Sequence, residues 1–280
     1  MAARPTTAGG GQAHRQAMET FTETPTDVAG ADEAVVTIPQ YTRRAILGIW
    51  AAAAIPMAVL AWVVAPVLSS TLDGPEPFAR AIIASLTLGM VWQFVLVAGL
   101  VRIEQGNLRW STLREALWLK APRSPRTGRV GGKVWLVIVP LIFAFAAEDI
   151  VPSLPRPASR DLGLFLESTA GQDFMHGAWG WFAVMLVMFL FNTVLGEELL
   201  FRGFLLPRMN GAFGDKDWLV NGGLFAGYHL HVPWMMPVIL LDTFVLAWPA
   251  KRYRSAWVSI SVHSAQSVFF AIAVLGLVLR

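Results

Sequence analysis

Residues 195–204, with the sequence LGEELLFRGF, place two adjacent glutamates and an arginine at the end of a strongly apolar stretch. Ionisable side chains are costly inside lipid, so each is a candidate for function whose partner must be identified. Glu198 and Arg202 are four positions apart, a spacing that lets them pair on one face of a helix. We predict that they form a buried ion pair, with a share in catalysis as the alternative for Glu198. Glu197 projects about 100° away from Glu198 and is left for chemistry.

Two histidines in later apolar stretches are predicted to reach a depth similar to that of Glu197. Helix rise puts Glu197 roughly 14 Å, His229 roughly 18 Å and His263 roughly 12 Å from the predicted cytoplasmic ends of their segments. A carboxylate in low-dielectric surroundings is a stronger base, and a nearby imidazole can orient water against it. We therefore predict Glu197 as general base and His229 as its water-positioning partner.

The same arrangement offers donors for the oxyanion that forms when water attacks an amide carbonyl. His263 is the first candidate donor. Ser267 lies one helical turn after it, on the same face, and is a second candidate. The alternative is that these polar residues form unrelated hydrogen bonds between packed helices.

A metal site is a competing interpretation, because two histidines and a glutamate are also a possible zinc ligand set. The chain contains no H-E-x-x-H helix, and each candidate ligand stands alone in its own segment. Cysteine is absent, which excludes disulfides, a thiol nucleophile and cysteine metal ligands. We expect no cofactor and no metal, and keep a metal-dependent membrane protease as an alternative.

The elements that must position these residues are predicted to be membrane helices. Of the 280 residues, 55% are apolar, and the apolar residues occur in blocks near the roughly 20 residues that a helix needs to cross a bilayer. We predict an all-α, polytopic membrane helix bundle of about seven transmembrane helices plus a short interfacial helix. The seven blocks lie near 45–70, 78–102, 133–149, 177–205, 217–232, 234–250 and 256–279.

The loop charges predict the topology of this bundle. Between Arg102 and Lys133 there are eight Lys or Arg and two Glu, whereas residues 148–175 carry five acidic residues and two arginines. The link at 251–254, KRYR, is again basic. The positive-inside rule then places the N-terminus in the cytoplasm and, after seven crossings, the C-terminus outside. The composition favours a bacterial plasma membrane, and we find no nucleic-acid signature.

Two segments are expected to lie outside the bilayer core. Residues 1–42 are rich in small and polar residues and are predicted to form a disordered cytoplasmic tail, which leaves 43–280 as one membrane-embedded domain. The stretch WSTLREALWL at 110–119 is predicted to be a short helix on the membrane surface, with a substrate-docking element as the alternative. Thr112 and Glu115 in it have capping-box spacing.

Three further residues are singled out. Phe225 is predicted to shape the site by packing, Asp242 to be a hydrogen-bond partner or a proton or substrate contact inside the bundle, and His231 to be solvated at the outer membrane edge.

Three ordered motifs resemble the CAAX prenyl protease and bacteriocin-processing (Abi) family of intramembrane glutamic endopeptidases. The first motif, E-E-x-x-x-R, is EELLFR at 197–202, and the second, F-x-x-x-H, is FAGYH at 225–229. The third, H-x-x-x-N, is HSAQS at 263–267, with Ser267 where asparagine is usual. The resemblance covers roughly residues 180–275.

This resemblance implies a protease-like domain that hydrolyses peptide bonds without a metal. Glu197 would activate water with the help of His229, while His263 and the residue at 267 would stabilise the oxyanion. The implied partners are the lipid bilayer and a peptide or protein substrate reached from the membrane or cytoplasmic side. A non-catalytic immunity or scaffold protein of the same fold, or a transporter using Glu197 and Asp242, are the alternatives.

Overall fold

The computed structural model of the protein describes residues 36–151 and 154–280. Within these ranges the chain folds into helices, and its only strand-like pairing is an isolated bridge between Arg123 and Val130. The all-α prediction is therefore confirmed. Residues 1–35, which hold most of the predicted tail, lie outside the described residues.

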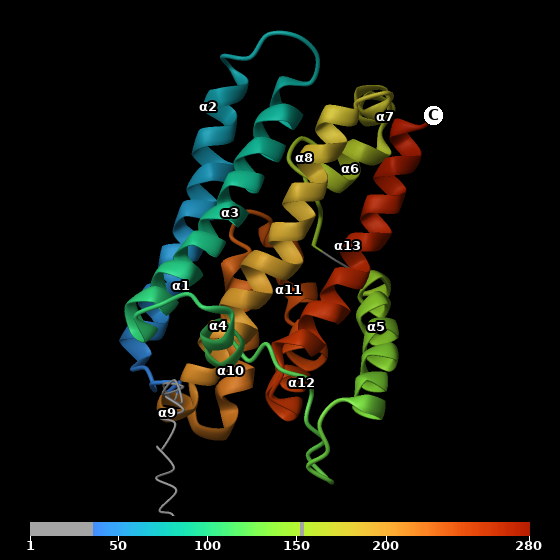
Figure 1. Ribbon diagram of the computed structural model, residues 1–280. Helices are drawn as coiled ribbons and strands as arrows, with labels where there is room; N and C mark the ends of the chain where they lie inside the picture. Colours follow the sequence, from blue (N-terminus) through green and yellow to red (C-terminus); the bar gives the residue numbers. More distant parts are fainter. Residues whose placement is uncertain (1–35, 152–153) are drawn as a thin grey trace, which may run out of the picture. The chain divides into compact units, whose positions relative to one another are not determined.

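Long apolar helices form the frame of the bundle (Figure 1). In the described part of the chain, four helices are long and apolar enough to cross a membrane: Arg43–Ser69, Pro77–Gln105, Trp179–Arg208 and Ala256–Val278. A fifth span results if Pro233–Ile239 and Thr243–Tyr253, which meet at a bend of 47°, are counted together. These findings confirm a polytopic membrane helix bundle but do not confirm seven crossings.

Two of the seven predicted blocks give short helices. Block 133–149 becomes η2 (Gly132–Val137), α5 (Ile138–Ala146) and η3 (Ala147–Ile150). Block 217–232 becomes α10 (Asp217–Tyr228), whose 12 residues extend about 18 Å. That length is well below the roughly 30 Å of a bilayer's hydrocarbon core, so α10 alone does not cross it.

The frame helices are divided as follows. The first span comprises α1 (Arg43–Val59), η1 (Leu60–Val64) and α2 (Ala65–Ser69), and the second is α3 (Pro77–Gln105). The third comprises α8 (Trp179–Leu190), η4 (Phe191–Gly196), η5 (Leu199–Leu205) and η6 (Leu206–Arg208). The fourth is α13 (Ala256–Val278). The elements between the third and fourth spans, besides α10, are α9 (Asn210–Phe213), η7 (Gly214–Lys216), η8 (Pro233–Met235), α11 (Met236–Ile239), η9 (Thr243–Ala247) and α12 (Trp248–Tyr253).

The third span lies in the middle of the packing. Helix α3 packs against α1, α2, α8 and η4, and α13 packs against α5, α8 and η9 (Figure 1). Helices α6 (Leu162–Glu167) and α7 (Thr169–Met175) were not predicted and stand close to the C-terminal end of α13. Their sequence signal is a pair of N-caps, because the side chains of Asp161 and Ser168 accept hydrogen bonds from the first turns of these helices.

Helix α4 (Trp110–Ala116) forms where the short interfacial helix was predicted. The capping-box prediction is wrong, because the helix begins two residues earlier than Thr112. Thr112 is buried inside the helix, and its hydroxyl lies 2.7 Å from the side-chain oxygen of Asn107. Asn107 also accepts a hydrogen bond from the backbone N–H of Arg109, so Asn107 supports the start of the helix.

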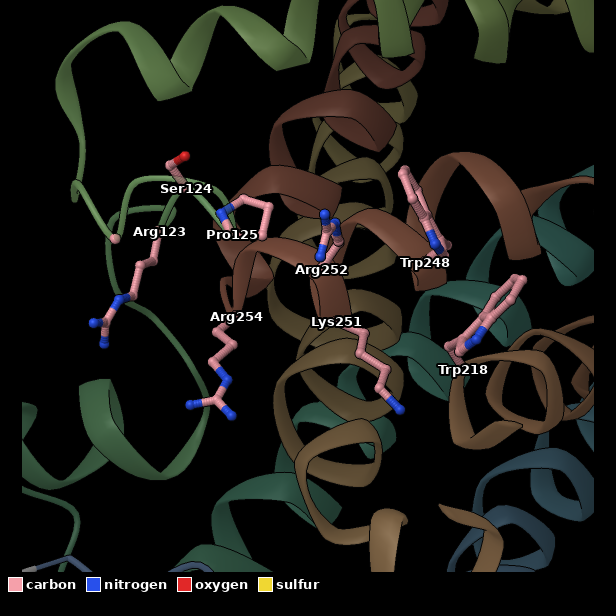
Figure 2. A pocket seen from close by; sticks show the side chains of 9 residues that line it. Arg123, Ser124, Pro125, Trp218, Trp248, Lys251, Arg252 and Arg254 are labelled. Carbon is pink, nitrogen blue, oxygen red and sulfur yellow. The ribbon is translucent and has the colours of Figure 1, made fainter. Parts of the chain in front are cut away.

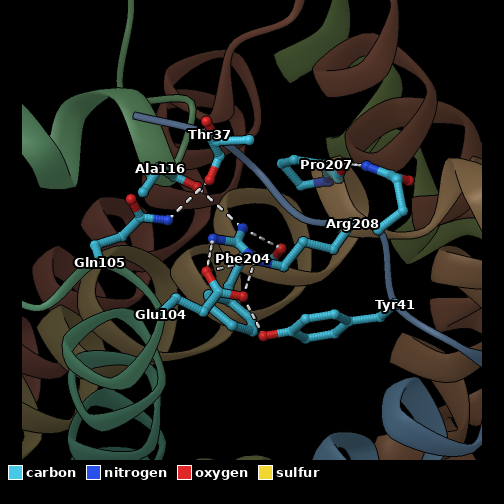
Figure 3. Close-up of polar contacts among 9 residues, drawn as sticks. Thr37, Tyr41, Glu104, Gln105, Ala116, Phe204, Pro207 and Arg208 are labelled. Atoms are coloured by element: carbon cyan, nitrogen blue, oxygen red, sulfur yellow. Dashed lines mark hydrogen bonds and ion pairs between the residues drawn. The ribbon is translucent and has the colours of Figure 1, made fainter. Parts of the chain in front are cut away.

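A buried polar cluster joins four segments beside the end of the third span (Figure 3). Arg208 donates to both carboxylate oxygens of Glu104 on α3 and to the carbonyls of Ala116 and Phe204. The Tyr41 hydroxyl donates to Glu104, and the backbone N–H of Tyr41 donates to the Arg208 carbonyl. Residues 36–42, assigned to the tail from sequence, therefore pack against the domain.

Candidate active site

Glu197 lies in the third span between two π-helical turns, η4 and η5, and only 1% of its surface is exposed. The preceding glycine is required for this geometry. A Cβ on Gly196 would lie 2.4 Å from the Phe191 carbonyl oxygen and 3.3 Å from that of Met90 on α3. Only glycine fits at this position, because the wide turn and α3 approach each other there at backbone distance.

Asn192 is a contact of Glu197 that the sequence analysis missed. With its amide nitrogen directed at the carboxylate, Asn192 donates to Oε1 at 2.9 Å and to Oε2 at 3.2 Å. The opposite orientation would face an amide oxygen with two carboxylate oxygens, which are all acceptors. The π-helical turn explains the contact, because residues five positions apart lie on the same face of such a turn.

His229 follows the last residue of α10 and directs its ring at Glu197. Its Nδ1 donates to the Phe225 carbonyl at 2.9 Å. Its Nε2 lies 3.8 Å from Oε1 of Glu197, too far for a direct hydrogen bond. With the proton fixed on Nδ1, the neutral ring presents an Nε2 lone pair toward the carboxylate.

The prediction that His231 is solvated is wrong. This residue is buried, and its ring stacks on that of His229 with centroids 5.3 Å apart. The reason is the short length of α10: the chain turns back immediately after Tyr228, so His231 folds against the site instead of extending toward solvent.

Glu198 connects two of the predicted site residues. Its Oε1 accepts a hydrogen bond from Arg202 Nη1 at 3.0 Å and another from His263 Nδ1 at 3.0 Å. Glu198 and Arg202 are fully buried, and His263 is 5% exposed. The predicted ion pair is present in the structure, and the histidine is an additional partner that the i, i+4 spacing did not indicate.

Phe225 lies between the two halves of this network. The Arg202 guanidinium lies over its ring at 3.9 Å, a favourable cation–π arrangement. The edges of the ring contact His229 at 4.9 Å and His263 at 6.3 Å between centroids. Phe225 thus shapes the site by packing.

Ser267 and Asp242 are buried as well. Ser267 lies one turn after His263 on α13, and within the described residues its hydroxyl makes no hydrogen bond. Asp242 is 4% exposed and stands at the bend between α11 and η9. A carboxyl group is therefore buried at the break of a helix pair.

The structure also bears on the alternative of a metal site. In the described ranges of the chain, no three His, Cys, Asp or Glu side chains are arranged to hold one metal ion. His229 Nδ1 faces a carbonyl and His263 Nδ1 faces Glu198, so only the Nε2 atoms of these two rings are available to bind an ion.

The close packing of α10 on η9 gives a testable prediction. A Cβ on Gly222 would lie 2.0 Å from Thr243 Oγ1 and 2.5 Å from its Cβ. Gly222→Ala should therefore separate these elements, which precede His229 and follow Asp242, and lower the free energy of unfolding by about 1–3 kcal/mol. Equilibrium unfolding in mixed detergent micelles measures this loss.

Gly223→Ala is the matched control, since nothing lies within 4 Å of a Cβ at that position. It adds a better helix former and should leave stability unchanged or slightly raised. Equal losses in the two variants would contradict the packing explanation.

Comparison with known proteins matches the segment that contains the candidate site residues. Residues 179–276 match the family model described as type II CAAX prenyl endopeptidase Rce1-like. The match contains Glu197, Glu198, Arg202, His229 and His263. It confirms the resemblance stated from the three motifs. Searches of curated proteins and of solved structures found no match.

Proposed function

We propose, from the similarity of residues 179–276 to the CAAX endopeptidases, that this protein is an intramembrane endopeptidase that uses a glutamate-activated water. One observation carries the proposal: the buried carboxylate of Glu197 faces the imidazole of His229 at 3.8 Å. This gap is longer than a hydrogen bond but suits a shared water molecule.

The proton positions explain how such a water would be activated. Glu197 and the Nε2 lone pair of His229 are both acceptors, so a water between them would donate one O–H to each. Its own lone pair would then point away from both groups and toward the substrate carbonyl. Glu197 would take the proton as the new C–O bond forms, and would pass it to the departing amine. Asn192, which donates to the carboxylate, would hold it in position.

His263 is proposed to stabilise the oxyanion through Nε2. Its Nδ1 already donates to Glu198, so donation from Nε2 requires a doubly protonated ring. The Glu198 carboxylate stabilises that cation. Ser267, one turn further along α13, would supply a second donor. In this scheme Glu198 serves catalysis through His263 as well as the helix through Arg202.

The substrate is proposed to be a peptide or protein segment that approaches from the membrane or from the predicted cytoplasmic side. An apolar cavity of about 220 Å³ flanks the helix that carries Glu197, and its lining includes Leu195 and Leu199 of that helix and Trp110 and Leu113 of α4. Because this cavity is lined by apolar side chains, it suits an apolar substrate segment.

The test is cleavage of a quenched fluorescent peptide library by purified protein in detergent, with and without a strong chelator. The library contains the same peptides with and without a prenylated C-terminal cysteine. Wild type should cleave at a rate unaffected by the chelator, and Glu197→Gln should cleave at least about a hundredfold more slowly. The preferred peptides then define the substrate.

Each other outcome points to a named alternative. Loss of wild-type cleavage with chelator, restored by zinc, would replace the glutamate mechanism with a metal-dependent one. Equal background from wild type and Glu197→Gln across the library would support the non-catalytic scaffold.

A further inference from the structure

A second site opens at the turn between α12 and α13, outside the network of Glu197. It is a pocket of about 590 Å³ (Figure 2). Its walls come from the 123–128 loop, from Trp218 on α10 and from α12 with the turn that follows it. The lining side chains are Arg123, Ser124, Pro125, Trp218, Trp248, Lys251, Arg252 and Arg254.

The pocket concentrates unneutralised positive charge. Lys251 is paired with the buried carboxylate of Asp217. Arg123, Arg252 and Arg254 are exposed, and none forms an ion pair within the described part of the chain. Three like charges around one concave surface repel one another and favour an anion between them. Arginine forks suit the oxygens of a phosphate group in particular.

The pocket is held in shape by backbone contacts. Arg123 N–H donates to the Tyr253 carbonyl at 2.9 Å, which fixes the 123–128 loop against the end of α12. Ala256 N–H donates to the Trp118 carbonyl at 2.9 Å on the other side of the turn. The Trp218 ring packs edge-on against Phe244 with centroids 5.8 Å apart. The arginines therefore extend from a defined frame.

The position of the pocket favours a lipid as the source of such an anion. It lies where the bent helix pair ends with its second half, Thr243–Tyr253, and the candidate span Ala256–Val278 begins. Trp248 and Phe244 on that second half are 41% and 57% exposed, so an apolar surface continues directly from the basic one. Tryptophan is enriched at membrane interfaces, and basic pockets between membrane helices bind anionic head groups.

We propose that the Arg123–Arg252–Arg254 pocket binds the phosphate head group of an anionic phospholipid, in the leaflet that the positive-inside rule assigns to the cytoplasm. The three guanidinium groups would bind the phosphate oxygens, while Trp218 and Trp248 would contact the glycerol and the upper acyl chains.

Native mass spectrometry of the purified full-length protein tests this proposal. The protein in dodecyl maltoside is titrated with phosphatidylglycerol or with phosphatidylcholine of the same acyl chains. Wild type should retain phosphatidylglycerol in preference to phosphatidylcholine. The triple variant Arg123→Gln/Arg252→Gln/Arg254→Gln should bind phosphatidylglycerol at least about tenfold more weakly.

A triple variant with equal charge loss, Arg44→Gln/Arg102→Gln/Arg109→Gln, is the matched control. These three arginines are exposed and lie outside the pocket. The control should bind as wild type does. If the pocket variant does not fold, Arg252→Gln alone should weaken binding about fivefold.

Three results would overturn the proposal. The first is equal retention of phosphatidylglycerol by wild type and the folded pocket variant. The second is an equal loss of lipid binding in the control variant. The third is full displacement of the lipid by an excess of inorganic phosphate or glycerol phosphate at matched ionic strength, which would assign the pocket to a soluble phosphate. Because the readout is lipid binding, each of these results leaves the proposed peptidase activity untouched.

Discussion

Glu197→Gln is expected to lower kcat for peptide cleavage by about 10²–10⁴-fold, the usual contribution of a general base. Glutamine keeps the shape of the side chain and one of its two acceptors for Asn192 but cannot take a proton from water. KM should change little, because the carboxylate is proposed to act on water and not to bind the substrate. Initial rates on a library-derived peptide, measured over a range of concentrations, separate kcat from KM.

Stability measurements decide what a loss of activity means. A neutral amide is cheaper to bury than a carboxylate, so Glu197→Gln should unfold at the same or a higher denaturant concentration than wild type. Glu167→Gln is the control for the same substitution at an exposed position outside the site, and its kcat should be unchanged. A Glu197→Gln variant that is folded and retains more than about a tenth of wild-type kcat would exclude Glu197 as the base.

The helical fold and most residues of the candidate site could be predicted from patterns in the sequence. The i, i+4 spacing of Glu198 and Arg202 predicts a contact that the structure contains at 3.0 Å. Each predicted apolar block contains a helix. Glu197 and His229, from different helices, do approach each other, as their similar predicted depths required.

Other features depend on departures from ideal α-helix that composition does not report. Asn192 and Glu197 are five positions apart, which places them about 140° apart on an α-helix. The π-helical turn η4 brings them to one face. His231 was misplaced for a related reason, since hydropathy extended block five past the end of α10 at Tyr228.

The predicted number of seven crossings is not confirmed, for a similar reason. A hydropathy window measures apolar composition and does not detect a 47° bend at Asp242 or the early end of α10. The positive-inside rule then gave consistent loop charges for seven segments, although only four or five in the described ranges are candidate spans. Loop charges alone therefore do not establish how many of the helices cross.

The second large expected effect concerns Glu198, which contacts both Arg202 on its own helix and His263, the proposed oxyanion donor. Glu198→Gln leaves the fully buried Arg202 without an anion, because no other ion pair of Arg202 exists among the described residues. Breaking a buried pair from one side typically costs about 3–5 kcal/mol. The variant should therefore lose that much unfolding free energy in a detergent-based unfolding titration, and should also lose cleavage.

The double variant Glu198→Gln/Arg202→Met separates the two roles. Methionine removes the unpaired charge and keeps an apolar contact with Phe225, so most of the lost stability should return. Cleavage should not return, because His263 still lacks the carboxylate that supports its second proton. If the double variant recovers both stability and kcat, Glu198 has only a structural role. If it is less stable than the single variant, Arg202 stabilises the fold through contacts other than Glu198, and the ion pair is not what holds this part of the helix.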